Sequence, residues 1–207
     1  MKVLIAEDDS SSRHRLVRLL SKWGHEVVEA SNGLAALEIL QGEDYPRIAI
    51  LDWLMPGMDG LQVCRAVRQF SKERYVYVLL LTAKNTKDDA IAGWEAGVDD
   101  YITKPFDSHE LQARLWAGLR IINLQDELIV ARETQRQLAT YDALTNIFNR
   151  RAVLDSLKRE IVRAQRGGPC VGVVMADLDH FKKINDTYGH QVGDLVLCEA
   201  AHRMKNA

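Results

Sequence analysis

The sequence predicts an α/β fold: a doubly wound sheet of five parallel strands, a long helix, and then a smaller region of mixed helix and strand. Short apolar runs alternate with amphipathic segments from residue 1 to about residue 118. A seam of mostly apolar residues at heptad spacing follows, and a further apolar run ends in acidic residues near Asp177. These three observations support the prediction.

Five apolar runs in the first region have the length and composition of strands: VLIA from residue 3, EVVEA from 26, RIAIL from 47, VYVLLL from 76 and DYIT from 100. Apolar residues three and four apart mark helices between them, over about Ser10 to Lys22, Gly33 to Leu40, Gly60 to Phe70 and Thr86 to Ala96. Because strand and helix alternate, we expect a parallel sheet with helices on both faces.

A long helix is expected to begin near Asp107 or Ser108 and to continue to about Tyr141, with Gly118 as its one potential breaker. About 34 residues of helix span roughly 50 Å. Its heptad seam consists of Ala117, Ile121, Leu124, Leu128, Ala131, Gln135 and Leu138. The seam favours a parallel two-helix stalk, and hence a homodimer, over a single amphipathic helix lying on its own domain.

The third region is expected to hold a helix to about Gln165, a Gly-Gly-Pro turn, a strand CVGVVMADL from residue 170, and two further helices, the last beginning near Gly193. The predicted division is therefore a first domain over residues 1–118, a helical coiled-coil linker over 119–140, and a third segment over 141–207.

Composition narrows the function classes. The net charge is −2 and no block of like charge stands out, so we expect no nucleic-acid partner. No run approaches the roughly 18 apolar residues of a membrane span. The three cysteines are odd in number, widely spaced and without Cys-x-x-Cys pairing, which is typical of a reduced, cytoplasmic protein.

Polar side chains follow four predicted strands of the first domain. The carboxyl ends of parallel strands meet at one edge of the sheet, where ligands bind. Crowded carboxylates repel one another unless a hard cation such as Mg²⁺ lies among them. A hydroxyl and an amine beside them can share the charge of a phosphoryl group. The residues concerned are Glu7, Asp8, Asp52, Thr82 and Lys104.

The motifs AEDDSSSR, LDWLMPGMDG, LLLTAK and YITKPF resemble those of the response-regulator receiver domain, in order and spacing, over the first 120 residues. The resemblance implies that Asp52 accepts a phosphoryl group from a histidine kinase or phosphotransfer protein. It also implies a cis peptide between Lys104 and Pro105. The other implied roles are Mg²⁺ binding by Asp8, Asp52 and the Leu54 carbonyl with Glu7 acting through water, phosphate contact by Thr82 and Lys104, and an aromatic switch at Tyr101.

A second cluster follows the predicted strand at residue 170. Asp177 and Asp179 flank Leu178, so in an extended chain their side chains point the same way. The turn His180-Phe181-Lys182 then opens a helix, whose free N–H groups attract phosphate. Acids for a metal and amides for phosphate suggest a Mg²⁺-nucleotide site, although the usual Gly-x-x-x-x-Gly-Lys loop is missing.

The motifs DALTNIFNRR, DLDHFKKIND and GHQVGDLVL resemble the N-terminal motifs of the GGDEF domain, the α+β, palm-like fold of diguanylate cyclases. The resemblance implies a second Mg²⁺, bound with GTP by Asp177 and the Leu178 carbonyl. It implies that His180, Phe181 and Lys182 face the phosphates. Asn185 and Asp194 are implied to bind guanine, which suits an acid that accepts from the guanine N–H edge.

The implied reaction joins two GTP molecules, one on each of two facing domains, into cyclic di-GMP. The Gly-Gly-Asp/Glu-Glu-Phe hairpin that names the family does not occur before Ala207. We therefore expect the chain as given to be the front of a longer protein, inactive as a cyclase, with a third segment that folds poorly because its partial sheet lacks neighbours.

The leading hypothesis is a two-component response regulator in which phosphorylation of Asp52 controls a diguanylate cyclase. The alternative is a phosphorylation-dependent binding or scaffold module with a degenerate GGDEF domain. A receiver-linked transcription factor ranks last, because no basic face or helix-turn-helix pattern follows residue 120.

Overall fold

A computed structural model of the protein describes residues 1–69, 75–83, 91 and 93–206. The chain forms two compact units, Met1–Leu128 and Ile129–Ala207. Among the described residues, no helix combines the length and the apolar character that crossing a membrane requires. The expected domain limits after residues 118 and 140 stay predictions.

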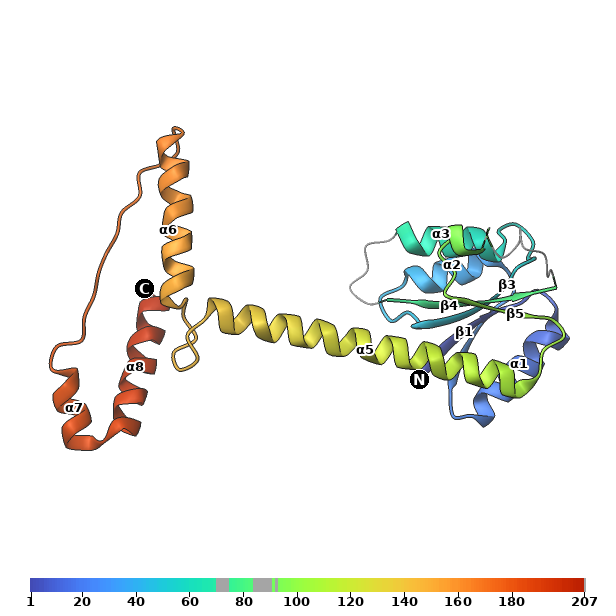
Figure 1. The fold of residues 1–207 in the computed structure, drawn as a ribbon, viewed down its shortest axis with the longest axis horizontal. Helices are drawn as coiled ribbons and strands as arrows, with labels where there is room; N and C mark the ends of the chain where they lie inside the picture. The colour runs from blue at the N-terminus through green and yellow to red at the C-terminus, as the bar shows by residue number, and fades with distance from the viewer. Residues whose placement is uncertain (70–74, 84–90, 92, 207) are drawn as a thin grey trace. The chain divides into compact units, whose positions relative to one another are not determined.

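The first unit is built on one sheet of parallel strands (Figure 1): β1 (Lys2–Ala6), β2 (Glu26–Ala30), β3 (Ile48–Asp52), β4 (Tyr77–Thr82) and β5 (Asp100–Thr103). The strand order is β2-β1-β3-β4-β5. Ala6 of β1 pairs with Leu51 of β3, so these two strands end side by side. The predicted doubly wound sheet of five parallel strands is confirmed.

Helices cover both faces of this sheet (Figure 1): α1 (Ser10–Lys22) and α5 (Ser108–Thr140) on one face, α2 (Gly33–Gln41) and α3 (Gly60–Gln69) on the other. Successive strand side chains point to opposite faces. Leu4 and Leu51 therefore pack in the core beside α2 and α3. Ile5 and Ile50 pack in the core beside α1 and α5.

Side-chain caps begin two of these helices. Asp9 accepts a hydrogen bond from the Ser12 N–H (2.7 Å), and Asn32 accepts one from the Ala35 N–H (2.9 Å). Each cap pairs one N–H group that the first helical turn leaves free. The helix expected from Thr86 to Ala96 falls mostly outside the described residues, and within it residues 91 and 93–95 are helical.

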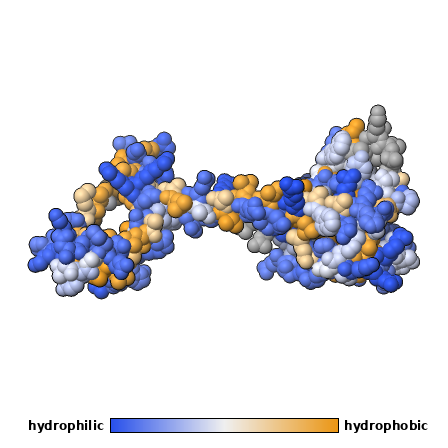
Figure 2. Space-filling view, turned by 60° about the horizontal axis from the view of Figure 1, so that its bottom comes forward, coloured by the Kyte–Doolittle hydropathy of each residue, from blue (hydrophilic) through white to orange (hydrophobic). Residues whose placement is uncertain are grey.

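Helix α5 is long and continuous, as the sequence predicts. The side chains of Leu111, Leu115 and Ile122 are buried against the first unit. Farther along, the Asp126 carboxylate lies 2.6 Å from the Arg47 guanidinium. All the predicted seam residues are exposed, and apolar surface is visible along the helix (Figure 2); they are Ala117, Ile121, Leu124, Leu128, Ala131, Gln135 and Leu138.

The second unit contains α6 (Arg150–Gln165), α7 (Phe181–Tyr188) and α8 (His190–Lys205). Before α6 the chain turns back on itself: Tyr141 forms an antiparallel bridge with Phe148, and their rings stack with centroids 5.4 Å apart. The predicted helix to Gln165 is confirmed, and the last helix begins at His190, slightly before the expected Gly193.

The prediction of a strand from residue 170 is wrong. Residues 170–178 form no ladder with any described segment, and the side chains of Val174 and Met175 are 94% exposed. A strand cannot pair its N–H and C=O groups alone, and an apolar run is buried only when a sheet neighbour and a covering helix are present.

Candidate functional site

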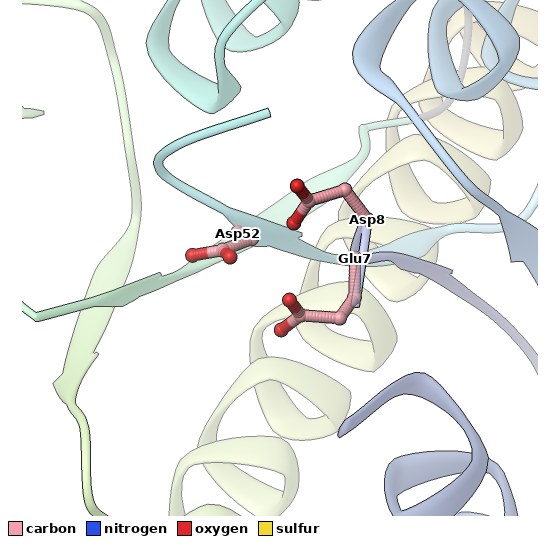
Figure 3. Close-up of side chains that lie close together, drawn as sticks. All are labelled: Glu7, Asp8 and Asp52. Atoms are coloured by element: carbon pink, nitrogen blue, oxygen red, sulfur yellow. The ribbon is translucent and has the colours of Figure 1, made fainter. Parts of the chain in front are cut away.

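Three carboxylates meet at the carboxyl edge of the sheet. Glu7 and Asp8 follow the end of β1, and Asp52 ends the neighbouring strand β3. Each offers an oxygen, and these oxygens all lie within 4.8 Å of one another. Figure 3 shows the side chains of Glu7 and Asp8 beside that of Asp52. The predicted convergence of these three residues is therefore present.

Lys104 joins the cluster from the loop after β5. Its ammonium lies 2.7 Å from a Glu7 carboxylate oxygen and 2.9 Å from an Asp52 oxygen. Its backbone N–H donates to the Thr82 carbonyl (2.6 Å), which attaches this loop to the end of β4. The peptide bond between Lys104 and Pro105 is cis, as the resemblance implied.

Burial sets the electrostatics of the cluster. Glu7 is 2% exposed and Asp52 is 8% exposed, while Asp8 is open to solvent. Burial raises the pKa of Glu7, against the opposing hydrogen bond from Lys104. Burial also acts to lower the pKa of Lys104, but hydrogen bonds to Glu7 and Asp52 outweigh it, so the pKa is raised. Lys104 is consequently a cation at neutral pH.

The loop after Asp52 is held tightly. The Trp53 N–H donates to the Leu81 carbonyl (2.8 Å), and the Gly60 N–H donates to the Trp53 carbonyl (2.9 Å). A β-carbon added at Gly60 would collide with the Asp52 carbonyl and would lie 2.8 Å from Leu80 Cδ1. Glycine is therefore required where α3 begins, because the helix backbone approaches β3 so closely.

Of the remaining predicted residues, Thr82 lies at the carboxyl end of its strand, whereas Tyr101 lies near the start of β5 and pairs with Leu80. Thr82 is buried at the end of β4, and Tyr101, on β5, is 36% exposed. Leu54, two residues beyond Asp52, has an exposed side chain. The contact of Thr82 with phosphate, the switch at Tyr101 and the metal bond of the Leu54 carbonyl stay predictions.

The residues present fit a divalent cation. The cluster combines three carboxyl groups with one ammonium group. Carboxylate oxygens are the ligands that Mg²⁺ takes in proteins, usually one or two together with water. Glu7, Asp8 and Asp52 could therefore hold such an ion.

Arg13 was not among the predicted site residues. Its guanidinium donates to the backbone carbonyl of Glu7 (2.7 Å) and lies 3.3 Å from that of Asp8. A basic residue in the first turns of a helix that follows two acids was the available signal, since helical side chains lean toward the N-terminus.

The second cluster is not assembled in the same way. Asp177, Leu178 and Asp179 lie before α7 on a segment that forms no ladder with any described residue, and their side chains are exposed. His180 adopts a left-handed conformation (φ 59°) and precedes α7 without a side-chain cap. The turn at His180-Phe181-Lys182 is formed, and its role toward phosphate stays a prediction.

Asn185 and Asp194 belong to two helices that pack together, α7 and α8. The Asn185 side-chain oxygen is buried without a hydrogen-bond partner among the described residues. It lies against Gly193, where a β-carbon would collide with it, and Asp194 is the next residue. The two predicted guanine ligands are thus brought near each other, whereas their contact with guanine stays a prediction.

Two family profiles match the chain. The family described as "Response regulator receiver domain" matches residues 3–116, and the family described as "Diguanylate cyclase, GGDEF domain" matches residues 139–207. The first match covers the sheet and its helices, and the second covers the α6 to α8 region.

Two curated proteins are similar to the chain. Response regulator MprA of Mycobacterium avium is 36% identical over 166 residues, which are 80% of this chain and 65% of that protein. Response regulator PleD of Caulobacter vibrioides is 31% identical over 203 residues, 98% of this chain and 44% of that protein. The chain therefore spans less than two thirds of either relative.

A solved structure resembles the first unit. The receiver domain of a sensor histidine kinase from Pseudomonas aeruginosa PAO1 matches with a TM-score of 0.51 and 28% identity, over 55% of this chain and 93% of that one. That structure is described as having a magnesium ion coordinated in its active-site cleft.

Proposed function

The chain belongs to the response-regulator receiver family and carries a GGDEF domain after the receiver, and we propose that phosphorylation of Asp52 controls a diguanylate cyclase output. The observation that supports this best is the acidic cluster of Glu7, Asp8 and Asp52 with Lys104 among them. It combines a buried nucleophile with a cation at the edge where parallel strands end.

In the proposed transfer, an Asp52 carboxylate oxygen attacks the phosphorus of a phosphohistidine on a kinase or phosphotransfer protein. The new P–O bond forms as the P–N bond breaks, and the imidazole leaves with the electron pair. Lys104, already 2.9 Å from Asp52, is placed to pair with the phosphoryl oxygens. Asp8, Asp52 and the Leu54 carbonyl, with Glu7 acting through water, would hold Mg²⁺, and this ion would supply positive charge near those oxygens.

Thr82 and Tyr101 are proposed to communicate phosphorylation to the rest of the receiver. Thr82 ends β4, one residue beyond the partner of Asp52 on that strand, and its hydroxyl would bind a phosphoryl oxygen. Tyr101 lies on the adjacent strand β5 with part of its ring exposed, so it has room to change position.

The proposed output is cyclic di-GMP made from two GTP molecules, with release of two pyrophosphates. Asp177 and the Leu178 carbonyl would hold the GTP-bound Mg²⁺. His180, Phe181 and Lys182 would face the phosphates, and Asn185 and Asp194 would bind guanine. The support is the match to the GGDEF family over residues 139–207 and the proximity of Asn185 to Gly193.

Because each GGDEF domain holds one GTP, the reaction requires two chains. The exposed seam of α5, from Ala117 to Leu138, is proposed to pair with the same seam of a second copy. Joining two domains in this way raises their effective concentration.

Labelling with acetyl phosphate and Mg²⁺ tests the first step. Mass spectrometry should find one added phosphoryl group on the wild type and none on Asp52→Asn. Asp44→Asn is the matched control, because Asp44 is exposed and pairs with Lys2 at the opposite end of the strands. Label on Asp52→Asn equal to that on the wild type would contradict the assignment.

A chain that includes the signature hairpin tests the regulation. A phosphodonor should raise its cyclic di-GMP output, and Asp52→Asn should remove this stimulation. A protein that accepts phosphate and binds GTP without forming product would instead support the binding or scaffold module.

A further inference from the structure

We propose that Arg13 is a positioning residue for the Mg²⁺ site: it holds the backbone of Glu7 and Asp8 so that both carboxylates face Asp52. This inference rests on the proposed function of the acidic cluster. It concerns a side chain that touches neither the ion nor the phosphoryl group.

The positions of the three carboxylates require the backbone to turn after β1. Successive side chains of a strand point to opposite faces, so Glu7 and Asp8 could not converge if β1 simply continued. The strand ends at Ala6, and oxygens of Glu7, Asp8 and Asp52 still lie within 4.8 Å of one another. The backbone at residues 7 and 8 must therefore turn, and its carbonyl groups must find new partners.

Arg13 supplies a donor for these carbonyls. One guanidinium nitrogen lies 2.7 Å from the Glu7 carbonyl and 3.3 Å from the Asp8 carbonyl. On the other side of the turn, the Glu7 N–H donates to the Ala30 carbonyl of β2 (3.2 Å). The peptide groups on both sides of Glu7 are thus bonded, which fixes the direction of its side chain.

The guanidinium is itself anchored. Its Nε lies 3.4 Å from a carboxylate oxygen of Glu29 on β2, and the Arg13 side chain is 17% exposed. The planar guanidinium can serve the carboxylate and the carbonyl together, because its donors point in fixed directions. Lysine, with one compact ammonium, cannot reproduce that arrangement.

The charge of Arg13 and its positioning role predict opposite changes in Mg²⁺ affinity when the residue is replaced, so an experiment can distinguish the two. Removing a positive charge near the cluster should strengthen Mg²⁺ binding slightly, because one repulsive cation is lost. Releasing the turn should weaken binding, since mutation of a residue that orients metal ligands typically costs about 10-fold to 100-fold in affinity. The sign of the change therefore identifies the role.

Calorimetric titration of the 207-residue chain with MgCl₂ tests the proposal. Arg13→Met should weaken Mg²⁺ binding about 10-fold or more, and Arg13→Lys, which keeps the charge, should also weaken it. Arg18→Met is the matched control: Arg18 is an exposed arginine on the same helix, and its loss should leave the affinity unchanged or slightly raised.

Circular dichroism without Mg²⁺ checks that each variant is folded. If Arg13→Met does not fold, Glu29→Gln retains the arginine and removes only its anchor, and it should weaken binding by a smaller factor. If Arg13→Met is folded and binds Mg²⁺ with wild-type affinity, the proposal is overturned. If Arg13→Met does not fold, wild-type affinity in Glu29→Gln overturns it. A loss of Mg²⁺ affinity in Arg18→Met equal to that in Arg13→Met would also overturn it. A wild type that takes up no Mg²⁺ would overturn the proposed function itself.

Discussion

The two acidic clusters of this protein use the same kinds of residues in different surroundings. Glu7 and Asp52 are almost completely buried, and Lys104 neutralises part of their charge. Asp177 and Asp179 are exposed on a segment with no strand partner among the described residues. The difference teaches that a motif supplies the ligands of a site, whereas a completed sheet gives them a common position.

The sheet accounts for this because it fixes several strand ends at once. Asp52 is held by the pairing of β3 with β1 on one side and with β4 on the other. Residues 170–178 have no such ladder, so the backbone before Asp177 is not oriented by neighbours. Four predictions test this comparison, in order of decreasing expected effect.

Truncation of an apolar side chain should matter in the first unit and not in the unpaired segment. Leu79→Ala removes a fully buried side chain of β4 and should lower the free energy of unfolding by about 2–5 kcal/mol. Met175→Ala removes a side chain that is 94% exposed and should change it by less than about 0.5 kcal/mol. Urea denaturation measures both, and equal losses would contradict the comparison.

Adding a methyl group should likewise affect stability in the first unit but not in the segment 170–178. Gly60→Ala places a methyl group against the Asp52 carbonyl and should cost about 1–3 kcal/mol while slowing phosphoryl labelling of Asp52. Gly172→Ala is the matched control, because nothing lies within 4 Å of the added carbon. A neutral Gly60→Ala variant with normal labelling would show that the approach of α3 to β3 is not needed.

The ion pair between Asp126 and Arg47 should stabilise the packing of α5 against the rest of the first unit. Asp126→Asn leaves an arginine whose side chain is 11% exposed without its anion, and should cost about 1 kcal/mol. Glu133→Gln, which breaks a pair of exposed residues farther along α5, should cost nothing measurable. A double-mutant cycle with Arg47→Met isolates the pair, and zero coupling energy would refute its role.

Thiol labelling at pH 8 should distinguish the two units while stability stays almost unchanged, because this pH lies below the range in which the Cys64 thiol affects stability. Burial raises the pKa of Cys64 to about 11 from 9.0, so the folded chain keeps a proton that the unfolded chain loses in this range. Stability should therefore fall as the pH rises from 9.0 to about 11. Iodoacetamide at pH 8 should label exposed Cys170 and spare Cys64; comparable rates would contradict the burial of Cys64.

Most of the first unit follows from pattern alone. Every predicted strand up to residue 103 is present, because short apolar runs alternate in the sequence with amphipathic segments. The meeting of acids from the ends of β1 and β3 also follows, since parallel strands end at one edge, whereas the turn that directs both Glu7 and Asp8 toward Asp52 does not. The strand expected at residue 170 fails, because an apolar run predicts burial without showing what will cover it.

Contacts between side chains and backbone are harder to predict from a sequence. The hydrogen bonds of Arg13 to the carbonyls of Glu7 and Asp8 depend on how the chain turns after β1, which no spacing rule encodes. The same holds for the Arg47 contact with Asp126, whose partners are far apart in the chain. Both contacts depend on tertiary geometry.

A titration with MgCl₂ followed by amide NMR tests the central claim most directly, because it monitors both clusters in one sample. We predict that signals of residues 7–9, 52–54 and 104 shift together with one affinity, while those of residues 177–179 stay in place over the same range. Shifts of equal size and affinity at residues 177–179, or none at residues 7–9 and 52–54, would contradict the account.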